Sequence, residues 1–526
     1  MKNQLAFNFT MCFLLSIASF SFAQKADPTP FANTINATDL RAHLSVLTAD
    51  SLEGRETGTE GNLKAAQYIA RYFEKLGLPK VVDGSYFQRM IYTNEAWNNI
   101  AMMVNDVTYR HQFNFYALPA LNPSVKDNIT MVEEVVFLGY GIEDKNYSDY
   151  KKADVKDKII MIYQGEPLKK DSISLITNSK TLSPWSSDIK LKLQLAFQKG
   201  VKTVLIIDPD LAKSVQENRR FFSRNVTGDV EKVEGRYPNS VFISPEIAKE
   251  IIGSKDGKFR KAHNRADKGK PTPLSMPCKL RLEMNKYFNQ LIGNNVLGFI
   301  EGSDPILKNE IVVVSAHYDH LGKRGADIYH GADDNGSGSS TVLEIVQAMT
   351  EAKKKGEGPR RSVLCMLMTG EEKGLLGSKY YVTYPIFPLE KTVADINIDM
   401  VGRVDEKYAA NPNYIYVIGA DKLSSDLNNI NEEMNKNYTK LTLDYTYNDE
   451  NDPNRYYYRS DHYNFAERGI PAIFYFNGTH EDYHRPSDTI DKINFEKMAK
   501  IGQLAFYTAW EIANRDERLK IDSKKK

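Results

Sequence analysis

The stretch from Ile311 to Asp334, which reads IVVVSAHYDHLGKRGADIYHGADD, is the strongest constraint on the fold of this chain. Its first four residues are β-branched and predict a buried strand, and polar residues follow at the carboxyl end of that strand. In an open α/β sheet, ligands bind at the carboxyl ends of the strands. His317, Asp319 and the later Asp334 therefore indicate a metal site at this edge of the predicted sheet.

The rest of the chain predicts an α/β fold around that strand. From about residue 283 onward, strand-like runs alternate with helical patterns, which indicates a mainly parallel mixed sheet with helices on both faces. Residues 110–282 read instead as short β-rich runs and turns with a small strand–helix–strand layout. We expect this middle region to be an inserted, smaller β-rich α/β accessory domain, and its basic segment 255–270 to be a solvated loop.

With 526 residues the chain is too long for one ordinary core. The expected organisation has four parts: a signal peptide at 1–23, a first part of the main domain at 24–109, the insert at 110–282, and a second part that carries the site at 283–526. The segment LEGRETGTEG, before a helical pattern that ends at Gly77, reads from composition as an N-terminal connection.

The first 23 residues have the features of an export signal. Lys2 precedes an apolar run from Met11 to Phe22, and Ser21-Phe22-Ala23 has the small–x–small form of a cleavage site. The run is shorter than the ~20 residues that span a bilayer, and no later stretch approaches that length. We therefore expect an exported protein, periplasmic or secreted, without stable membrane insertion.

Charge and cysteine content exclude other classes of protein. The formal net charge of +1 gives no electrostatic reason to expect a nucleic acid or an anionic membrane as partner. Three cysteines, of which Cys12 lies in the signal, do not form a disulfide framework. A buried thiol at Cys365 is favoured over a bridge from Cys278 to Cys365.

Acids and histidines follow four predicted strands in the second half of the chain. The segments are HYDH with the loop GADDNGSG, then MTGEE, then NIDMVG, and last THEDYHRPSD. A lone aspartate at a strand end is more often a helix cap, and a lone histidine is more often a surface residue. Four such segments on successive strand ends of one sheet converge in space. The candidate donors are His317, one of Asp333 and Asp334, one of Glu371 and Glu372, Asp399, and His484.

Two histidines and three carboxylates without a thiolate suit Zn²⁺, with Mn²⁺ or Co²⁺ as substitutes. Five ligands exceed the need of one tetrahedral zinc that keeps a water. They suit two ions about 3.5–4 Å apart that share a bridging carboxylate, an arrangement that serves amide hydrolysis. From spacing alone, Asp333 competes with Asp334 for the bridge, and His480 competes with His484 as a ligand.

Two further residues have expected roles beside the metals. Glu371 and Glu372 are adjacent and point in different directions, so one can bind metal while the other takes a proton from a water. Asp319 lies two residues after His317 on the same side of a strand. It can therefore receive the second imidazole N–H and fix the tautomer.

The motifs HYDH, GADDNGSG, TGEEKGLLGS, NIDMVG and YHRPSDT, in this order, resemble the co-catalytic zinc aminopeptidases and their glutamate-carboxypeptidase-like relatives. LEGRETGTEG looks like the N-terminal segment of that family, and the middle region resembles a protease-associated domain. The resemblance implies a zinc exopeptidase fold. It also implies two Zn²⁺ per chain, a peptide substrate with a free N-terminus, and hydrolysis of the first peptide bond.

Carried over to this chain, the resemblance implies a role for each donor. His317 and Asp399 would bind one zinc, Glu372 and His484 the other, and Asp334 would bridge them.

By the same resemblance, Glu371 would be the general base and Asp319 the partner of His317. The segment RSDHYNF resembles one that lines the family's site, so Asp461 and His462 are candidates for contact with the ligands. His320 and His330 match no family role and are expected at the surface or behind the ligands.

Three other functions are open at this point. A glutaminyl cyclase-like aminoacyltransferase shares the fold but uses one zinc. A glutamate-carboxypeptidase-like dipeptidase needs basic residues for the substrate carboxylate, with Arg403, Arg455, Arg459 and Arg485 as candidates. A receptor-like relative would have lost its ligands, and all five are retained here. The tyrosine-rich segment 444–463 is the expected substrate-facing loop.

Overall fold

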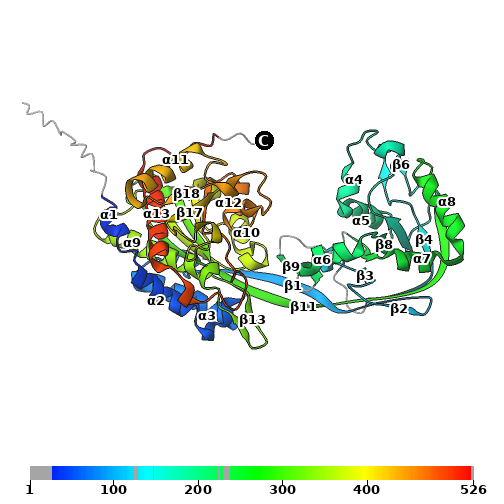
Figure 1. The fold of residues 1–526 in the computed structure, drawn as a ribbon, viewed down its shortest axis with the longest axis horizontal. Coiled ribbons are helices and arrows are strands. Elements are labelled where there is room, and N and C mark those ends of the chain that lie inside the picture. The colour runs from blue at the N-terminus through cyan, green and yellow to red at the C-terminus, as the bar shows by residue number, and fades with distance from the viewer. Residues whose placement is uncertain (1–26, 124–127, 146, 223–224, 229–236, 523–526) are drawn as a thin grey trace, which may run out of the picture. The chain divides into compact units, whose positions relative to one another are not determined.

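The computed structural model describes residues 27–123, 128–145, 147–222, 225–228 and 237–522. The predicted signal peptide, 1–23, lies outside the described residues. The chain divides into two compact units (Figure 1). The first unit is formed by Met1–Gln88 and Asn295–Lys526, and the second unit is Arg89–Asn294.

The second unit is longer at both ends than the insert predicted at 110–282. Its boundaries fall inside two long strands, β1 (Phe87–Val104) and β11 (Leu274–Ile300). The change of texture near residue 110 comes after β2 (Val107–Tyr109), which forms an antiparallel hairpin with β1. The change in sequence pattern therefore marks the end of the hairpin, whereas the boundary of the second unit in the structure lies earlier, within β1.

The first unit contains a mixed, mainly parallel sheet in the order β18-β17-β19-β16-β12-β15-β11. Strand β12 pairs in parallel with β15 and β16, and β16 pairs in parallel with β19. The pairs β17–β19 and β11–β15 are antiparallel. The strands are β12 (Ile311–His317), β15 (Ser362–Met368), β16 (Thr392–Ile398), β17 (Tyr414–Ile418), β18 (Thr442–Asp444) and β19 (Ala472–Phe476).

Helices cover both faces of this sheet, as predicted. Alternate residues of β12 enter two different cores, with Val312 and Val314 in one and Val313 in the other. The larger core joins β12 to α1 (Thr29–Ala32), α2 (Ala37–Leu47), α3 (Glu60–Leu76), α9 (Gly338–Lys354), α11 (Ser425–Met434) and α13 (Phe495–Asn514). The smaller core holds α10 (Leu376–Thr383) and α12 (His462–Glu467).

Helix α3 shows how local sequence sets an element. Thr59 caps its first turn by accepting a hydrogen bond from the backbone N–H of Asn62. Gly77 ends the helix with a φ of 81°, a left-handed conformation that glycine adopts without steric cost. The buried side chains between them, which include Ile69 and Phe73, recur at helical spacing and pack into the larger core.

The second unit is also α/β, as predicted. Its sheet has the order β11-β4-β7-β8-β10-β3, in which β4, β7, β8 and β10 are parallel. The strands are β3 (Phe115–Tyr116), β4 (Ile129–Phe137), β7 (Ile159–Tyr163), β8 (Thr203–Ile207) and β10 (Asn239–Ile243). The helices are α4 (Pro184–Ser187), α5 (Ile189–Gln198), α6 (Leu211–Phe222), α7 (Pro245–Ile252) and α8 (Asp256–Ala266). The likeness of this unit to a protease-associated domain stays a prediction.

One local prediction about the second unit is wrong. The basic segment 255–270 is largely helix α8 and not a solvated loop. Phe259, Ala262 and Ala266 recur at steps of three and four and are buried, so the segment has an apolar stripe among its charges.

Cys278 and Cys365 are both buried free thiols, so they form no disulfide. Within the described part of the chain, no helix has the length and apolar character needed to cross a bilayer.

Candidate metal centre

The four predicted strand ends lie at one edge of the first unit's sheet. Because β12 lies between its parallel neighbours β15 and β16, the three strands end on the same side. His317 is the last residue of β12, and Asp399 directly follows β16. Glu371 and Glu372 open a short 3₁₀ turn after β15. His484 comes from the loop after β19.

The first group of donors surrounds His317. Its Nε2 lies 3.3 Å from Asp399 Oδ1, 3.5 Å from Asp334 Oδ1 and 3.9 Å from Glu371 Oε2. His317 Nε2 and Asp399 Oδ1 are buried and have no hydrogen-bond partner among the described residues. Ligand atoms about 2.1 Å from a tetrahedral zinc lie about 3.4 Å from one another. The spacing of His317, Asp399 and Asp334 thus fits one zinc ion better than it fits direct hydrogen bonds.

The second group of donors surrounds Glu372 and the other oxygen of Asp334. His484 Nε2 lies 3.0 Å from Asp334 Oδ2 and 3.4 Å from Glu372 Oε1. Asp334 therefore presents Oδ1 to the first group and Oδ2 to the second. A carboxylate that bridged two ions would need its two oxygens placed in this way.

Asp333 and His480, the competitors left open by spacing, lie outside both groups. Asp333 is buried and accepts hydrogen bonds from the backbone N–H of Gly402, at 2.6 Å, and from Asn477 Nδ2, at 3.1 Å. His480 Nε2 lies 3.2 Å from Asp333 Oδ2. The two residues therefore pair with each other beside the centre.

His320 is a donor to which the sequence motifs assign no role. It is buried, and its Nδ1 lies 2.9 Å from Glu372 Oε1 and 3.8 Å from Asp334 Oδ2. His320 and His484 thus approach the same carboxylate oxygen from two sides. Three donor atoms from His320, Asp334 and Glu372 lie close enough together to hold an ion. The only sequence signal was the place of His320 within HYDH.

Asp319 contacts His317 differently from the prediction. His317 Nδ1 lies 3.1 Å from the backbone carbonyl oxygen of Asp319 and 3.6 Å from its Oδ1, so the nearer acceptor is the backbone. The Asp319 carboxylate accepts hydrogen bonds from Thr57 Oγ1 (2.8 Å) and from the backbone N–H of Glu371 (3.2 Å). It therefore joins the LEGRETGTEG segment to the turn that carries Glu371.

The two adjacent glutamates have opposite electrostatic environments. Burial raises the pKa of Glu371 well above its usual value, and the charges of Glu372 and Asp399 add to this while His317 opposes it. For Glu372, burial is outweighed by hydrogen bonds and charges from His320 and His484, so its pKa is well below the usual value. Neighbouring carboxyls with diverging pKa values are typical of an acid–base group beside a ligand.

The segment RSDHYNF contributes more than the two predicted residues. Ser460, which was not predicted, donates a hydrogen bond to Asp399 Oδ2 at 2.7 Å and accepts one from Asn397 Nδ2 at 2.8 Å. Asp461 is buried, with a pKa raised to about 7 by burial and held down by the charge of His317. The imidazole of His462 stacks on Phe474 with centroids 4.9 Å apart, so His462 packs in the core beside the centre.

Tyr483 and the arginines lie around the same edge. The ring of Tyr483 stacks on His484 with centroids 3.9 Å apart, and its hydroxyl accepts a hydrogen bond from Arg459 Nη2 at 3.4 Å. Burial, together with the charges of Asp334 and Glu372, raises the pKa of Tyr483, so the phenol remains protonated. Arg403 pairs with Asp482 at 2.9 Å and is thereby engaged within the protein.

The tyrosine-rich segment 444–463 is partly core. Tyr447 and Tyr456 pack with Tyr416 and Phe476, with ring centroids 4.5 to 6.2 Å apart. The prediction of a substrate-facing loop is wrong for these two tyrosines, because tyrosine density does not distinguish a packed aromatic cluster from an exposed one. Tyr458 in the same segment is exposed.

The part of the chain that carries the site is similar to known peptidases. Residues 295–509 match the model of Peptidase family M28. Over 216 residues the chain is 33% identical to a probable leucine aminopeptidase of Trichophyton verrucosum (strain HKI 0517), which covers 40% of this chain and 56% of that protein. It is 28% identical over 258 residues to Aminopeptidase YwaD of Bacillus subtilis (strain 168), covering 48% and 51% respectively. The chain thus spans about half the length of the curated relatives it matches.

A solved structure shows the same fold. The aminopeptidase from Aneurinibacillus sp. strain AM-1 superposes with a TM-score of 0.55 at 18% sequence identity, covering 94% of this chain and 98% of that chain. The five candidate ligands, His317, Asp334, Glu372, Asp399 and His484, all fall within the region that matches the family model. The match to the model of Peptidase family M28 thus spans residues 295–509, the part of the chain that carries the candidate metal centre.

Proposed function

We propose that this chain is an exported aminopeptidase that binds two zinc ions and hydrolyses the first peptide bond of peptides with a free N-terminus. The observation that carries the proposal is the position of Asp334. Its two carboxylate oxygens face two separate groups of buried donors, one around His317 and one around Glu372. The relatives that are named aminopeptidases support the choice of reaction.

The donor set fits zinc. His317 and Asp399 would hold one ion, Glu372 and His484 the other, and Asp334 both, with Mn²⁺ or Co²⁺ as substitutes. His320 would support the second group through its contact with Glu372. Zinc ions, when bound there, supply Lewis acidity toward the substrate carbonyl and the attacking water.

Glu371 is the residue that we assign to proton transfer. Its Oε2 lies 3.9 Å from His317 Nε2, beside the first group of donors. Its backbone N–H donates a hydrogen bond to the Asp319 carboxylate. A carboxyl whose pKa is raised by burial holds a proton better than a free one. Glu371 would take the proton from the attacking water and return it to the departing amine.

Export is part of the proposal and is supported by the apolar run from Met11 to Phe22 followed by a small–x–small site. Comparing the N-terminus of protein recovered from the cell envelope or medium with the printed sequence tests it. A mature chain that begins after Ala23 is expected.

The activity is tested with a panel of aminoacyl-p-nitroanilides and purified mature protein. We expect release of p-nitroaniline, loss of activity with a chelator, recovery with Zn²⁺, and two zinc ions per chain by metal analysis. N-acetylated versions of the same substrates are the control and should not be hydrolysed. One zinc per chain together with cyclisation of N-terminal glutamine would instead support the cyclase.

Glu371→Gln separates the base from the ligands. The substitution keeps the side-chain volume and removes the proton acceptor, so kcat should fall by about 10²–10⁴-fold. Zinc content should stay at the wild-type value, because Glu371 is not among the proposed ligands. A variant with near-normal kcat would show that another group takes the proton.

A further inference from the structure

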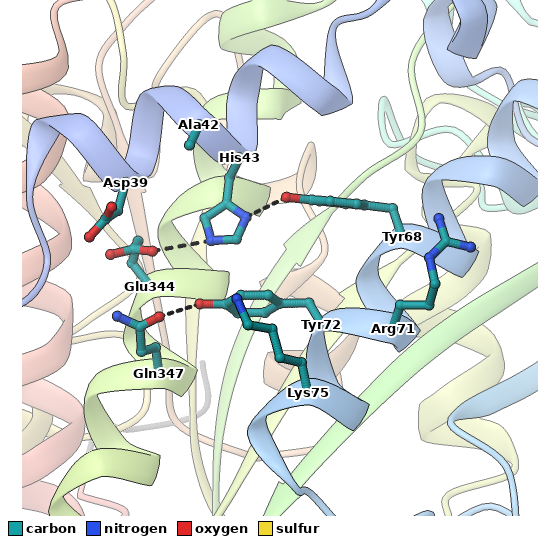
Figure 2. A pocket seen from close by; sticks show the side chains of 9 residues that line it. All are labelled: Asp39, Ala42, His43, Tyr68, Arg71, Tyr72, Lys75, Glu344 and Gln347. Carbon is teal, nitrogen blue, oxygen red and sulfur yellow. Dashed lines mark hydrogen bonds and ion pairs between the residues drawn. The ribbon is translucent and has the colours of Figure 1, made fainter.

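A pocket lies in the first unit between α2, α3 and α9, and it shares no residue with either donor group (Figure 2). Its volume is about 430 Å³, within the range of small-molecule sites. At its centre is His43 on α2, flanked by Tyr68 from α3 and Glu344 from α9 (Figure 2). The pocket is therefore built from three helices that are distant in sequence.

A buried carboxylate faces this pocket with part of its hydrogen-bonding capacity unused. The side chain of Glu344 is 1% exposed, and its Oε1 lies 3.1 Å from His43 Nε2. Its Oε2 is buried and has no hydrogen-bond partner among the described residues. A buried carboxylate oxygen without a partner costs free energy, and one that lines a pocket is in a position to be satisfied by a bound group.

The contacts of His43 prevent it from satisfying both oxygens. Tyr68 Oη lies 2.7 Å from His43 Nδ1, and burial together with the charge of Glu344 raises the pKa of Tyr68 to about 12. Because a carboxylate only accepts, the tautomer with its N–H on Nε2 faces Glu344 Oε1, and in that tautomer Nδ1 accepts from the Tyr68 hydroxyl. The imidazole has no further donor for Oε2.

The charges around the pocket are of both signs. Asp39 and Glu344 stand at one end in Figure 2, and Arg71 stands at the other, with Lys75 along the wall formed by Tyr72. Arg71 and Lys75 form no ion pair with any described residue. Gln347 is already engaged, because its Oε1 accepts the hydrogen bond of the Tyr72 hydroxyl.

These charges decide the chemistry of the ligand. An anion would meet Asp39 and Glu344, and a cation would meet Arg71 and Lys75. An apolar molecule would leave Glu344 Oε2 desolvated and unpaired. A small molecule with an ammonium at one end and a carboxylate at the other satisfies both ends, and the rings of Tyr68 and Tyr72 supply walls for an apolar side chain.

We propose that this pocket binds a free amino acid as a zwitterion, with its ammonium toward Glu344 and its carboxylate toward Arg71 and Lys75. The charge argument is independent of the proposed peptidase activity. Only the source of the ligand rests on the proposed function, since free amino acids are what such an enzyme releases.

The test is equilibrium dialysis of zinc-loaded mature protein with radiolabelled L-leucine. Glu344→Gln and Arg71→Ala should each weaken binding at the pocket about tenfold or more, because each removes a charged partner. Lys64→Ala is the matched control, since Lys64 is exposed on the same helix α3 outside the pocket, and it should bind leucine as wild type does. Unchanged binding in both pocket variants would overturn the proposal.

Two singly charged analogues sharpen the result. 3-Methylbutylamine lacks the carboxylate and 4-methylpentanoate lacks the ammonium, so each should compete with leucine at least about tenfold less well than leucine itself. Equal competition by either analogue would contradict a zwitterion site.

The variant His484→Ala distinguishes leucine bound at the metal centre from leucine bound in the pocket. It should abolish binding at the metal centre and leave binding in the pocket unchanged. A protein without peptidase activity that still binds leucine in a Glu344-dependent way would overturn the proposed function and keep the pocket. If leucine binding were lost in His484→Ala but unchanged in the pocket variants, the pocket proposal would be overturned and the proposed function kept.

Discussion

The two units contain parallel strands of similar kind, yet they treat the polar residues near those strands differently. In the second unit, Asp208 follows β8 and accepts hydrogen bonds from the backbone N–H of Asp210 (3.0 Å) and from Tyr116 (3.2 Å). Asp149 accepts from two backbone N–H groups and from the Tyr147 hydroxyl. Both oxygens of each carboxylate are engaged by the protein itself.

In the first unit the corresponding strand ends hold atoms that the protein leaves unpaired. His317 Nε2 and Asp399 Oδ1 are buried without a hydrogen-bond partner among the described residues. Both donor groups that could hold a metal among the described residues lie in this unit. A strand-end acid by itself therefore does not mark a site, and unpaired buried donors that face one another do.

The largest effect should come from exchanging a carboxylate in each unit. Asp334→Asn keeps the shape and removes the charge that would bridge two ions, so zinc content should fall and kcat/KM should drop by about 10³-fold or more. Asp149→Asn should leave kcat/KM unchanged and destabilise the second unit by about 1–3 kcal/mol. Metal analysis, steady-state kinetics and calorimetry of the two variants test this prediction. An Asp334→Asn protein that still binds two zinc ions would show that this carboxylate is not needed to hold them.

The units also differ in how they use a buried cation. The Arg55 guanidinium is fully buried and donates to the carbonyls of Tyr318 (2.7 Å), His330 (2.7 Å), Gly331 (3.0 Å) and Leu47. Burial lowers the pKa of Arg55 to about 10, which still leaves it charged at neutral pH. In the second unit, Lys192 donates to the carbonyls of Tyr163 and Gly165.

Arg55→Met should therefore be the more damaging of two parallel changes. It leaves four buried carbonyl oxygens without a hydrogen-bond donor, and we expect a loss of about 3–5 kcal/mol in the free energy of unfolding. Lys192→Met leaves two carbonyl oxygens without a donor and should lower the free energy of unfolding by about 1–3 kcal/mol. Calorimetry of the full chain compares the variants. Equal losses of stability would show that the number of carbonyl oxygens left without a donor does not determine the loss.

A smaller effect is expected from a hydroxyl that orients a proposed ligand. Ser460→Ala removes the hydrogen bond to Asp399 Oδ2 and should weaken zinc binding about 10–100-fold, measured by competition with a chelator of known affinity. Ser240→Ala in the second unit removes a buried hydroxyl that donates to the Leu121 carbonyl and should leave zinc affinity unchanged. A Ser460→Ala protein with wild-type affinity would exclude a positioning role for this serine.

The smallest effect concerns pH. Burial lowers the pKa of His462 to about 3, below the value of about 6.5 expected in the unfolded chain. The unfolded state binds the proton more readily, so stability is present above pH 6.5 and is lost as pH falls toward 3. We expect a loss of about 2 kcal/mol from this group between pH 7 and pH 5.

His462→Phe should remove that part of the pH dependence in calorimetric scans. In the second unit, burial lowers the pKa of His111 to about 4, so its contribution should stop changing near pH 4, earlier than that of His462. An unchanged pH profile in His462→Phe would show that other groups dominate acid unfolding.

Several features could be predicted from short-range patterns. The apolar run of β12 and the alternation of strands and helices predicted the mainly parallel sheet with both faces covered, because burial on two faces requires near-continuous apolar strands. The acids and histidines after β12, β15 and β16 could be expected to meet, since parallel strands end at one edge. His484, far along the chain, was included through its motif and not through strand geometry.

Other features depended on contacts between distant segments. Arg55 lies in a stretch that composition reads as a connection, yet its guanidinium joins backbone segments more than 260 residues away. His320 and Ser460 gained their roles only once Glu372 and Asp399 were placed beside them. Tyr456 became a core residue, and Tyr447 packs against the same cluster, because β17 and β19 present Tyr416 and Phe476 to them.

The sequence by itself determined the fold class of the first unit and which residues could act as metal donors, because both follow from local pattern and residue chemistry. Tertiary structure decided which donor atoms face one another: Asp334 and not Asp333 lies between the two groups, and His480 pairs with Asp333 beside them. Adjacent residues with the same chemistry differ only in the direction of their side chains. That direction is set by packing against segments hundreds of residues away.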